Sequence, residues 1–130
     1  MDNFSDHYGV DRFASYIGIE LLEVSQGKAK AKMEIGEHHL NGLGILHGGA
    51  LFTLADFVFG IAGNTQKIDA VAVSASITFM KAVSKGALYA EAKEVALTTR
   101  LGAYHAFVKD EGGEIIALFQ GLGYRKKSNE

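Results

Sequence analysis

Asp56 is the side chain whose sequence surroundings most favour chemistry. It is the only charged residue between His47 and Lys67, in a segment that is otherwise almost entirely apolar. Because burying an unpaired carboxylate is costly, we expect Asp56 to be partly accessible, hydrogen-bonded or shifted toward its neutral form. A carboxylate held in an apolar wall suits a general base or a nucleophile. The alternative is an aspartate on a helix face that touches solvent or caps a neighbouring element.

The tripeptide His47-Gly48-Gly49 stands immediately before this apolar segment. The first turn of a helix has backbone N–H groups without partners, and the helix dipole adds partial positive charge there. Glycine lets a ligand approach that backbone closely. The tripeptide therefore predicts a cradle for a carbonyl oxygen that gains negative charge. The alternative is a flexible helix entry, with His47 at the surface or as a cap.

The other reactive patterns are weaker. The glycines that follow Asn41 lack the third glycine of a dinucleotide fingerprint, and there is no GK[ST] phosphate loop. His38 and His39 are adjacent, so in an extended segment they face opposite ways and do not share a metal ion. His105 is interpreted as structural. With no cysteine and no serine in a G-x-S-x-G context, a thiol or hydrolase-type serine nucleophile is excluded. We expect neither a metal nor a cofactor.

Apolar periodicity and turn residues predict the elements that must position these groups. The segment 48–65 is too long for a strand and shows no alternation, so it predicts a helix that is apolar nearly all round. Helices and strands are segregated along the chain, which favours an α+β fold with a mainly antiparallel sheet curling around the long helix. The predicted elements are a helix at 4–16 capped by Ser5 and stopped by Gly18, strands at 19–24 and 28–35, a loop at 37–46, the helix at 48–65, and strands at 71–80, 88–97, 103–109 and 114–124, the last two joined by a turn at 110–113.

One sheet cannot cover a helix that is apolar on all sides. We therefore expect a partner for the uncovered part, and a self-complementary homodimer is the commonest solution.

Composition limits the class of protein. The 130 residues are 48% hydrophobic and 22% charged, which fits a single folded domain over 1–130 with a flexible tail at 126–130. Thirteen basic against fifteen acidic side chains give a net charge of −2, so no basic face for nucleic acid is expected. The longest apolar stretch, 50–62, is too short to span a membrane and contains Asp56. The absence of cysteine and of a secretory signal predicts a cytoplasmic protein.

The pattern Asn41-Gly-Leu-Gly-Ile-Leu-His47-Gly48-Gly49, followed by Leu54-Ala55-Asp56, resembles hotdog-fold acyl-CoA thioesterases of the phenylacetic-acid-degradation type. The resemblance covers nearly the whole chain. It implies a hotdog fold, in which a curved antiparallel sheet wraps a long helix, and dimers or tetramers with active sites at the dimer interface. It also implies that Asp56 is the catalytic carboxylate, that the Gly48 N–H forms the oxyanion hole, and that Asn41 and His47 place the thioester or the water.

The resemblance extends to substrate binding. It implies contacts from Gly49 and from a hydroxyl on the strand after the helix, for which Ser74 and Ser76 are both candidates. Lys81 and Arg100, with Lys85 and Arg125, could hold the CoA phosphates or could be solvated surface charges. The proline that such proteins carry after this strand is absent, and Ala82 stands nearby. An aryl or medium-chain acyl group fits equally well, and Asp56 could act as base or nucleophile. The rival hypotheses are an acyl-thioester hydratase or dehydratase and a non-catalytic acyl-CoA binding module.

Overall fold

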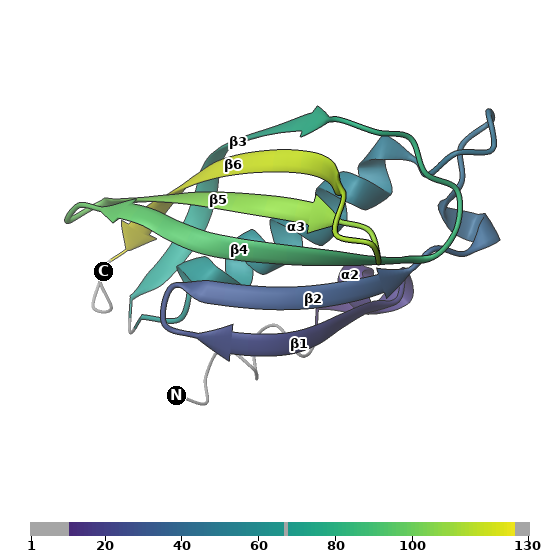
Figure 1. Ribbon diagram of the computed structural model, residues 1–130. Helices are drawn as coiled ribbons and strands as arrows, with labels where there is room; N and C mark the ends of the chain where they lie inside the picture. Colours follow the sequence, from purple (N-terminus) through teal and green to yellow (C-terminus); the bar gives the residue numbers. More distant parts are fainter. Residues whose placement is uncertain (1–10, 67, 127–130) are drawn as a thin grey trace.

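The structure is a computed structural model, and it describes residues 11–66 and 68–126. One long helix and six strands dominate it (Figure 1). In chain order the elements are α2 (Arg12–Tyr16), β1 (Ile19–Ser25), β2 (Lys28–Glu34), the 3-10 turn η1 (Glu37–His39), α3 (Gly48–Gly63), β3 (Asp69–Phe79), β4 (Ala87–Leu97), β5 (Leu101–Lys109) and β6 (Ile115–Lys126).

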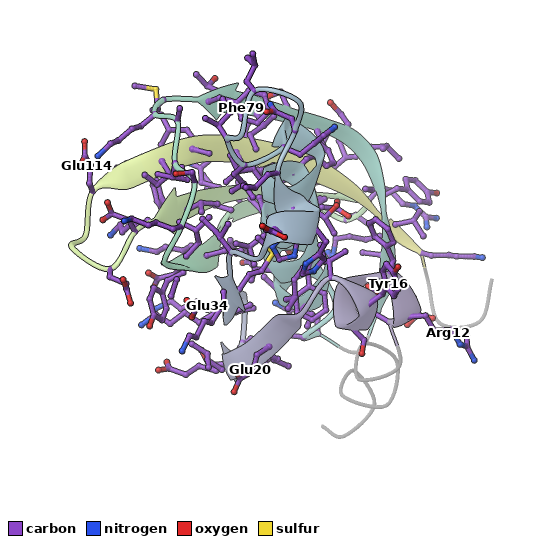
Figure 2. The ribbon with its side chains drawn as sticks, turned by 90° about the vertical axis from the view of Figure 1, so that its right-hand side faces the viewer. Arg12, Tyr16, Glu20, Glu34, Phe79 and Glu114 are labelled. Atoms are coloured by element: carbon purple, nitrogen blue, oxygen red, sulfur yellow. The ribbon has the colours of Figure 1, made fainter. Side chains whose placement is uncertain are left out.

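The six strands form one antiparallel sheet in the order β1-β2-β4-β5-β6-β3. The sheet curves around α3, which lies against its concave face (Figures 1 and 2). The predicted strand at 28–35 is β2, and on it Ala29, Ala31 and Met33 are buried while the intervening lysines are not. The structure confirms the predicted α+β class, with a curved antiparallel sheet around a long central helix.

Helix α3 begins and ends at polar caps. The Nδ1 atom of His47 accepts a hydrogen bond from the Gly49 N–H and so caps the first turn. The helix ends at Gly63, two residues before the predicted end, because Asn64 turns the chain toward β3. The Asn64 side chain donates to the Gly60 carbonyl at 2.8 Å and accepts from the Ala70 N–H at 3.0 Å.

Two expectations for the chain ends need correction. The predicted helix at 4–16 is described only as α2, which Asp11 caps by accepting from the Ala14 N–H, and Ser5 lies outside the described residues. Helix α2 turns Ala14 and Ile17 toward the core, where both are buried. Phe13 and Tyr16 point away from the core and are exposed. At the other end Lys126, assigned to the tail, pairs with Asp69 in the sheet.

Strand β3 contains a β-bulge that the sequence pattern does not reveal. The strand alternates as if Val71, Val73 and Ala75 shared one face, but pairing with β6 shifts between Ala72 and Ser74. The extra residue reverses the alternation, so Ala70 and Ala72 share a face with Ala75, Ile77 and Phe79. The simple alternation of the sequence over 71–79 therefore does not give the residues that share a face on β3.

Part of the apolar surface stays uncovered in one chain. Strand β3 is an edge of the sheet, and Val71 and Val73 on it are 58% and 57% exposed. On α3 the half-covered positions Thr53, Asp56 and Gly60 follow the exposed Gly49 at helical spacing and form one stripe. Within the part of the chain that is described, no helix has the length and apolarity needed to cross a membrane.

Candidate active site

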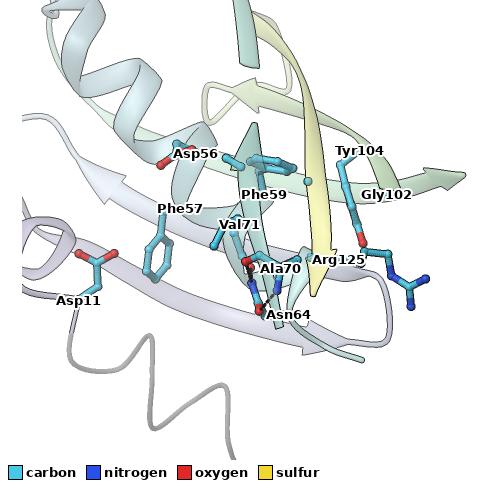
Figure 3. Close-up of a pocket in the computed structure, with 14 residues that line it drawn as sticks. Asp11, Asp56, Phe57, Phe59, Asn64, Ala70, Val71, Gly102, Tyr104 and Arg125 are labelled. Carbon is cyan, nitrogen blue, oxygen red and sulfur yellow. Dashed lines mark hydrogen bonds between the residues drawn. The ribbon is translucent and has the colours of Figure 1, made fainter. Parts of the chain in front are cut away.

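Asp56 projects from the middle of α3 into a cavity of about 250 Å³ (Figure 3). The cavity follows the helix face from Asp56 through Gly60 to Gly63, three positions that share a face at helical spacing. Partial burial raises the pKa of the Asp56 carboxyl above its ordinary value, and the charge of Asp11 raises it further. Among the described residues, none donates a hydrogen bond to this carboxylate. The cavity is also lined by Phe57, Phe59, Val71, Tyr104 and Arg125.

Gly48 occupies the first position of α3, where its backbone N–H has no hydrogen-bond partner within 11–66 and 68–126. The next amide is different, because the Gly49 N–H donates to the Nδ1 atom of His47 at 2.8 Å. The His47 carbonyl accepts from Ala50 and Leu51. The helix start therefore keeps one free donor at its positive end, at Gly48, while Gly49 is used within the helix cap.

Asn41 builds the loop that leads to this helix start. Its side-chain oxygen accepts from the N–H groups of Leu43, at 2.9 Å, and Ile45, at 3.3 Å. Its backbone N–H donates to the Ile45 carbonyl, and a bridge joins Leu40 to Leu46. The side-chain nitrogen of Asn41 has no hydrogen-bond partner among the described residues, and Asn41 is one of the residues that line the groove beside Gly48. Asn41 thus shapes the loop with its oxygen and keeps its NH₂ group for another acceptor.

The groove beside Gly48 measures about 370 Å³ and is separate from the Asp56 cavity. A Cβ atom on Gly48 would lie 3.0 Å from the Phe79 ring, so the ring packs directly on the helix start. Lys81 borders the same groove and forms an ion pair with Glu114 at 2.6 Å. This hydrogen bond and the charge of Glu114 raise the pKa of Lys81.

One chain does not bring the two predicted halves of the site together. Eight residues separate Gly48 from Asp56 on a continuous helix, which is about 12 Å along its axis at 1.5 Å per residue. A thioester carbonyl group needs an oxyanion donor and a base within about 3 Å of its own atoms. Within one protomer the two groups are too far apart to meet at one carbonyl.

The predicted binding residues are dispersed. Ser76 lines a recess with Thr78, His105 and Gln120, on the sheet face opposite α3, and Ser74 lies beside the β-bulge. Arg100 precedes β5 and lies over the Tyr124 ring, whereas Lys81 pairs with Glu114, in the turn that joins the other end of β5 to β6. A nine-residue strand spans roughly 30 Å, so these two cations lie at opposite ends of a protomer.

Sequence reasoning missed three residues of the site. Asp11 and Tyr104 line the Asp56 cavity, although they belong to segments distant in sequence. Tyr104 is buried, and burial raises its pKa to about 12. Phe79 covers the helix start. The alternating pattern of β5 could have marked Tyr104 as inward-facing, whereas no local signal links Asp11 to Asp56.

Comparison with known proteins identifies the class. The sequence profile described as Thioesterase superfamily matches residues 43–117, more than half of the chain. This chain belongs to the thioesterase superfamily. It is similar to the acyl-coenzyme A thioesterase PaaI of Escherichia coli, with 33% identity over 119 residues, 91% of this chain and 85% of that protein. It is also similar to a candidate esterase of Archaeoglobus fulgidus, with 40% identity over 119 residues, 91% of this chain and 77% of that protein.

Solved structures give the same result for the fold. The E. coli PaaI structure superposes on this thioesterase with a TM-score of 0.90 at 31% identity, over 95% of this chain and 90% of that chain. A variant of the phenylacetic acid degradation protein PaaI from Thermus thermophilus gives 0.85 at 34% identity, over 88% and 99%. The fold is therefore the hotdog fold, and the chain is a thioester hydrolase of the PaaI-like type.

The half-buried Asp56 and the free N–H of Gly48 are suited to activating a nucleophile and to stabilising an oxyanion. No cluster of three His, Asp or Glu side chains that could hold a metal ion occurs among residues 11–66 and 68–126.

Proposed function

We propose that this thioesterase hydrolyses acyl-CoA thioesters at a site shared by two copies of the chain. Asp56 of one protomer and the Gly48 N–H of the second copy act on the same thioester. The observation that carries this proposal is the separation of about 12 Å between these residues on one helix. Asp56 lines the cavity, Gly48 lines the groove, and neither group has a hydrogen-bond partner among the described residues. A site that contains both groups therefore forms only when a second chain supplies one of them.

The uncovered surfaces support a homodimer. The edge strand β3 is open to hydrogen bonding, and Phe79 and Met80 at its end are 53% and 57% exposed. Two β3 strands pairing antiparallel about a two-fold axis would extend the sheet and set the two α3 helices antiparallel. Gly49, Thr53 and Gly60 are small, so the helices can approach closely along that stripe. If the two-fold axis crosses the helices near position 52, midway between Gly48 and Asp56, then Asp56 of one helix lies beside the start of the other.

The reaction needs no further reagent than water. Asp56 removes a proton from water as the water oxygen attacks the thioester carbon, or it attacks that carbon itself and water then cleaves the anhydride. The carbonyl oxygen becomes an oxyanion and accepts a hydrogen bond from the Gly48 N–H. The C–S bond breaks and the thiolate leaves, with a carboxylic acid as the other product. The proton taken from water passes from Asp56 to the thiolate or to solvent, which restores the ionised carboxylate. Because a thiol has a pKa of about 8.5, its departure needs no strong acid. Asn41 and His47 place the thioester or the water.

The Asp56 cavity supports an aryl or medium-chain acyl group. Its walls include Phe57, Phe59 and Val71, and its volume of about 250 Å³ accommodates a ring or a short chain. The E. coli relative is named an acyl-coenzyme A thioesterase, which supports CoA as the thiol. Two cations are proposed to bind the CoA phosphates. One is Lys81, which borders the Gly48 groove, and the other is Arg100 of the second protomer, which lies at the opposite end of its own chain. Ser74 and Ser76 lie on β3, the strand proposed to form the dimer contact. Gly49 donates to His47 and so supports the helix cap next to the Gly48 N–H.

A pair of substitutions at Gly48 tests the oxyanion donor. Proline is well tolerated at the first helical position and removes the N–H, and His47 already has the extended backbone that precedes proline. Alanine adds the same Cβ toward Phe79 but keeps the N–H. We expect Gly48→Pro to lower kcat by about 100- to 1000-fold relative to Gly48→Ala. The assay is thiol release from a panel of aryl and aliphatic acyl-CoA esters. Equal activity of the two variants would show that this N–H does not stabilise the oxyanion.

A further inference from the structure

His39 is the buried polar side chain of the described part of the protein, with 4% of its surface exposed. Its Nδ1 atom lies 2.9 Å from the Gly36 backbone nitrogen, and its Nε2 atom lies 2.7 Å from the Ile17 carbonyl oxygen. A backbone N–H can only donate and a carbonyl can only accept. The ring is therefore neutral, with its proton on Nε2, and both nitrogens are satisfied.

These contacts join three segments at one residue. Ile17 is the C-terminal cap of α2, and Gly36 is the residue before η1. The backbone carbonyl of His39 accepts a hydrogen bond from the His47 N–H at 2.8 Å. The two hydrogen bonds of the His39 ring therefore fix the position of the His39 backbone carbonyl. That carbonyl in turn holds His47, the residue before Gly48.

The peptide plane that carries the Gly48 N–H also carries the His47 carbonyl, because a peptide bond is planar. That carbonyl accepts from the N–H groups of Ala50, at 2.9 Å, and Leu51, at 3.3 Å. On its other side, His47 is held by its own N–H bond to His39. The direction of the Gly48 N–H is therefore fixed by two sets of hydrogen bonds to His47. One set comes from the helix, through Ala50 and Leu51, and the other comes from the His39 carbonyl.

We propose that His39 is a positioning residue for hydrolysis, which aims the Gly48 N–H through the backbone of His47. The inference rests on the proposed function, because it assigns a task to the same donor. His39 lines neither the Asp56 cavity nor the groove beside Gly48, so it is not placed to touch the substrate. Its two ring contacts have separable tasks. The Gly36 contact is local and fixes the η1 turn that carries the His39 carbonyl, whereas the Ile17 contact fastens that turn to α2.

Asparagine and glutamine separate these tasks. The side-chain oxygen of Asn at position 39 can replace Nδ1 and accept from Gly36, while the side-chain nitrogen of Gln can replace Nε2 and donate to Ile17. We expect His39→Gln to lower kcat by about 10- to 100-fold with KM within about twofold, since a displacement near 1 Å has that effect on a reacting geometry. We expect His39→Asn to recover most of the wild-type kcat, although both variants unfold at a lower temperature.

Val108→Ala is the matched control, because Val108 is fully buried in β5 and belongs to neither hollow. It should lower Tm without changing kcat per folded molecule. The amide resonance of Gly48 gives a second readout, which should shift in His39→Gln and stay in place in Val108→Ala. If kcat in the His39 variants follows only the loss of Tm, or if Asn and Gln behave alike, the inference is wrong. Asp56→Asn separates a failure of the proposed function from a failure of the His39 inference. If Asp56→Asn stays active, the proposed function is wrong. If Asp56→Asn is inactive while His39→Gln keeps the wild-type kcat, only the His39 inference is wrong.

Discussion

Asp11 and Asp56 line the same cavity, and the charge of Asp11 raises the pKa of Asp56 beyond the effect of burial. Asp11 is fixed there by its own task, since its side chain caps α2 at Ala14. In the view of Figure 3 the Phe57 ring lies beside Asp11, and Asp56 lies above both. A residue that starts a short helix thus affects the carboxylate proposed to do the chemistry.

The acid limb of the pH profile should report this coupling. Hydrolysis requires ionised Asp56, so kcat/KM should fall as the pH drops through its pKa, which burial and then Asp11 hold above the ordinary value. Removing the Asp11 charge lowers that pKa. We expect Asp11→Asn to move the acid limb of kcat/KM to lower pH, measured as thiol release between about pH 4 and 8.

Asp69→Asn is the control for net charge, because Asp69 is exposed on β3 and outside the cavity. Its profile should overlay that of the wild type. The coupling is refuted if both variants shift the limb equally, and the base assignment is refuted if the wild-type profile is flat.

Asp56→Asn should stabilise the protein at neutral pH while abolishing most activity. A carboxyl whose pKa is raised on folding supports the folded state below the unfolded pKa, and this support is lost as the pH rises through the folded pKa. At pH 7 ionised Asp56 therefore opposes folding, and the neutral amide removes that cost. We expect a higher Tm for the variant at pH 7 and no difference at about pH 3, with kcat lower by about 100- to 10,000-fold. Lower stability of the variant at pH 7 would contradict this reading of the burial.

Mixing two inactive variants should restore activity. A heterodimer of Asp56→Asn and Gly48→Pro has one site with both defects and one site with neither, if the two residues act across the subunit boundary. Random reassociation makes about half of the dimers mixed, so about a quarter of the wild-type activity should return. The measurement is thiol release after joint unfolding and refolding. Recovery at background level would show that each chain uses its own Gly48 and Asp56.

Gly63 offers a test of the acyl cavity. A Cβ atom there would lie 3.9 Å from the Tyr104 ring, which is an ordinary contact, so Gly63→Ala should fold normally. We expect stability to rise by up to about 1 kcal/mol, since alanine favours the helix over glycine. The added methyl group narrows the cavity, so kcat/KM should fall most for the longest acyl-CoA in a chain-length series. Gly42→Ala, where nothing lies within 4 Å, should leave the series unchanged.

The order and type of the elements followed from local signals. The alternation of alanine and lysine in β2 and the long apolar run of α3 determine their structures almost by themselves. The bulge in β3 could not be predicted, because it depends on which residues of β6 pair with Ala72 and Ser74. The exposure of Phe13 and Tyr16 depends likewise on how α2 packs on the rest of the chain.

The candidate site divides in the same way. Asp56 and Gly48 were recognisable because an isolated acid and a glycine pair are locally unusual. Asp11 and His39 were not, because their importance comes from contacts across the fold, with Asp56 in one case and Ile17 in the other. The serines remain a prediction, since the register of β3 decides only which sheet face Ser76 occupies.

The bulge between Ala72 and Ser74 also bears on aggregation. An eleven-residue edge strand with valines on it would otherwise be a template to which any extended peptide could add. The irregular spacing of its hydrogen-bonding groups selects against a regular strand, whereas a second β3 running in the opposite direction carries the same irregularity and can match it. The bulge therefore makes the open edge a poor template for a regular strand, and we expect it to favour a second β3 strand.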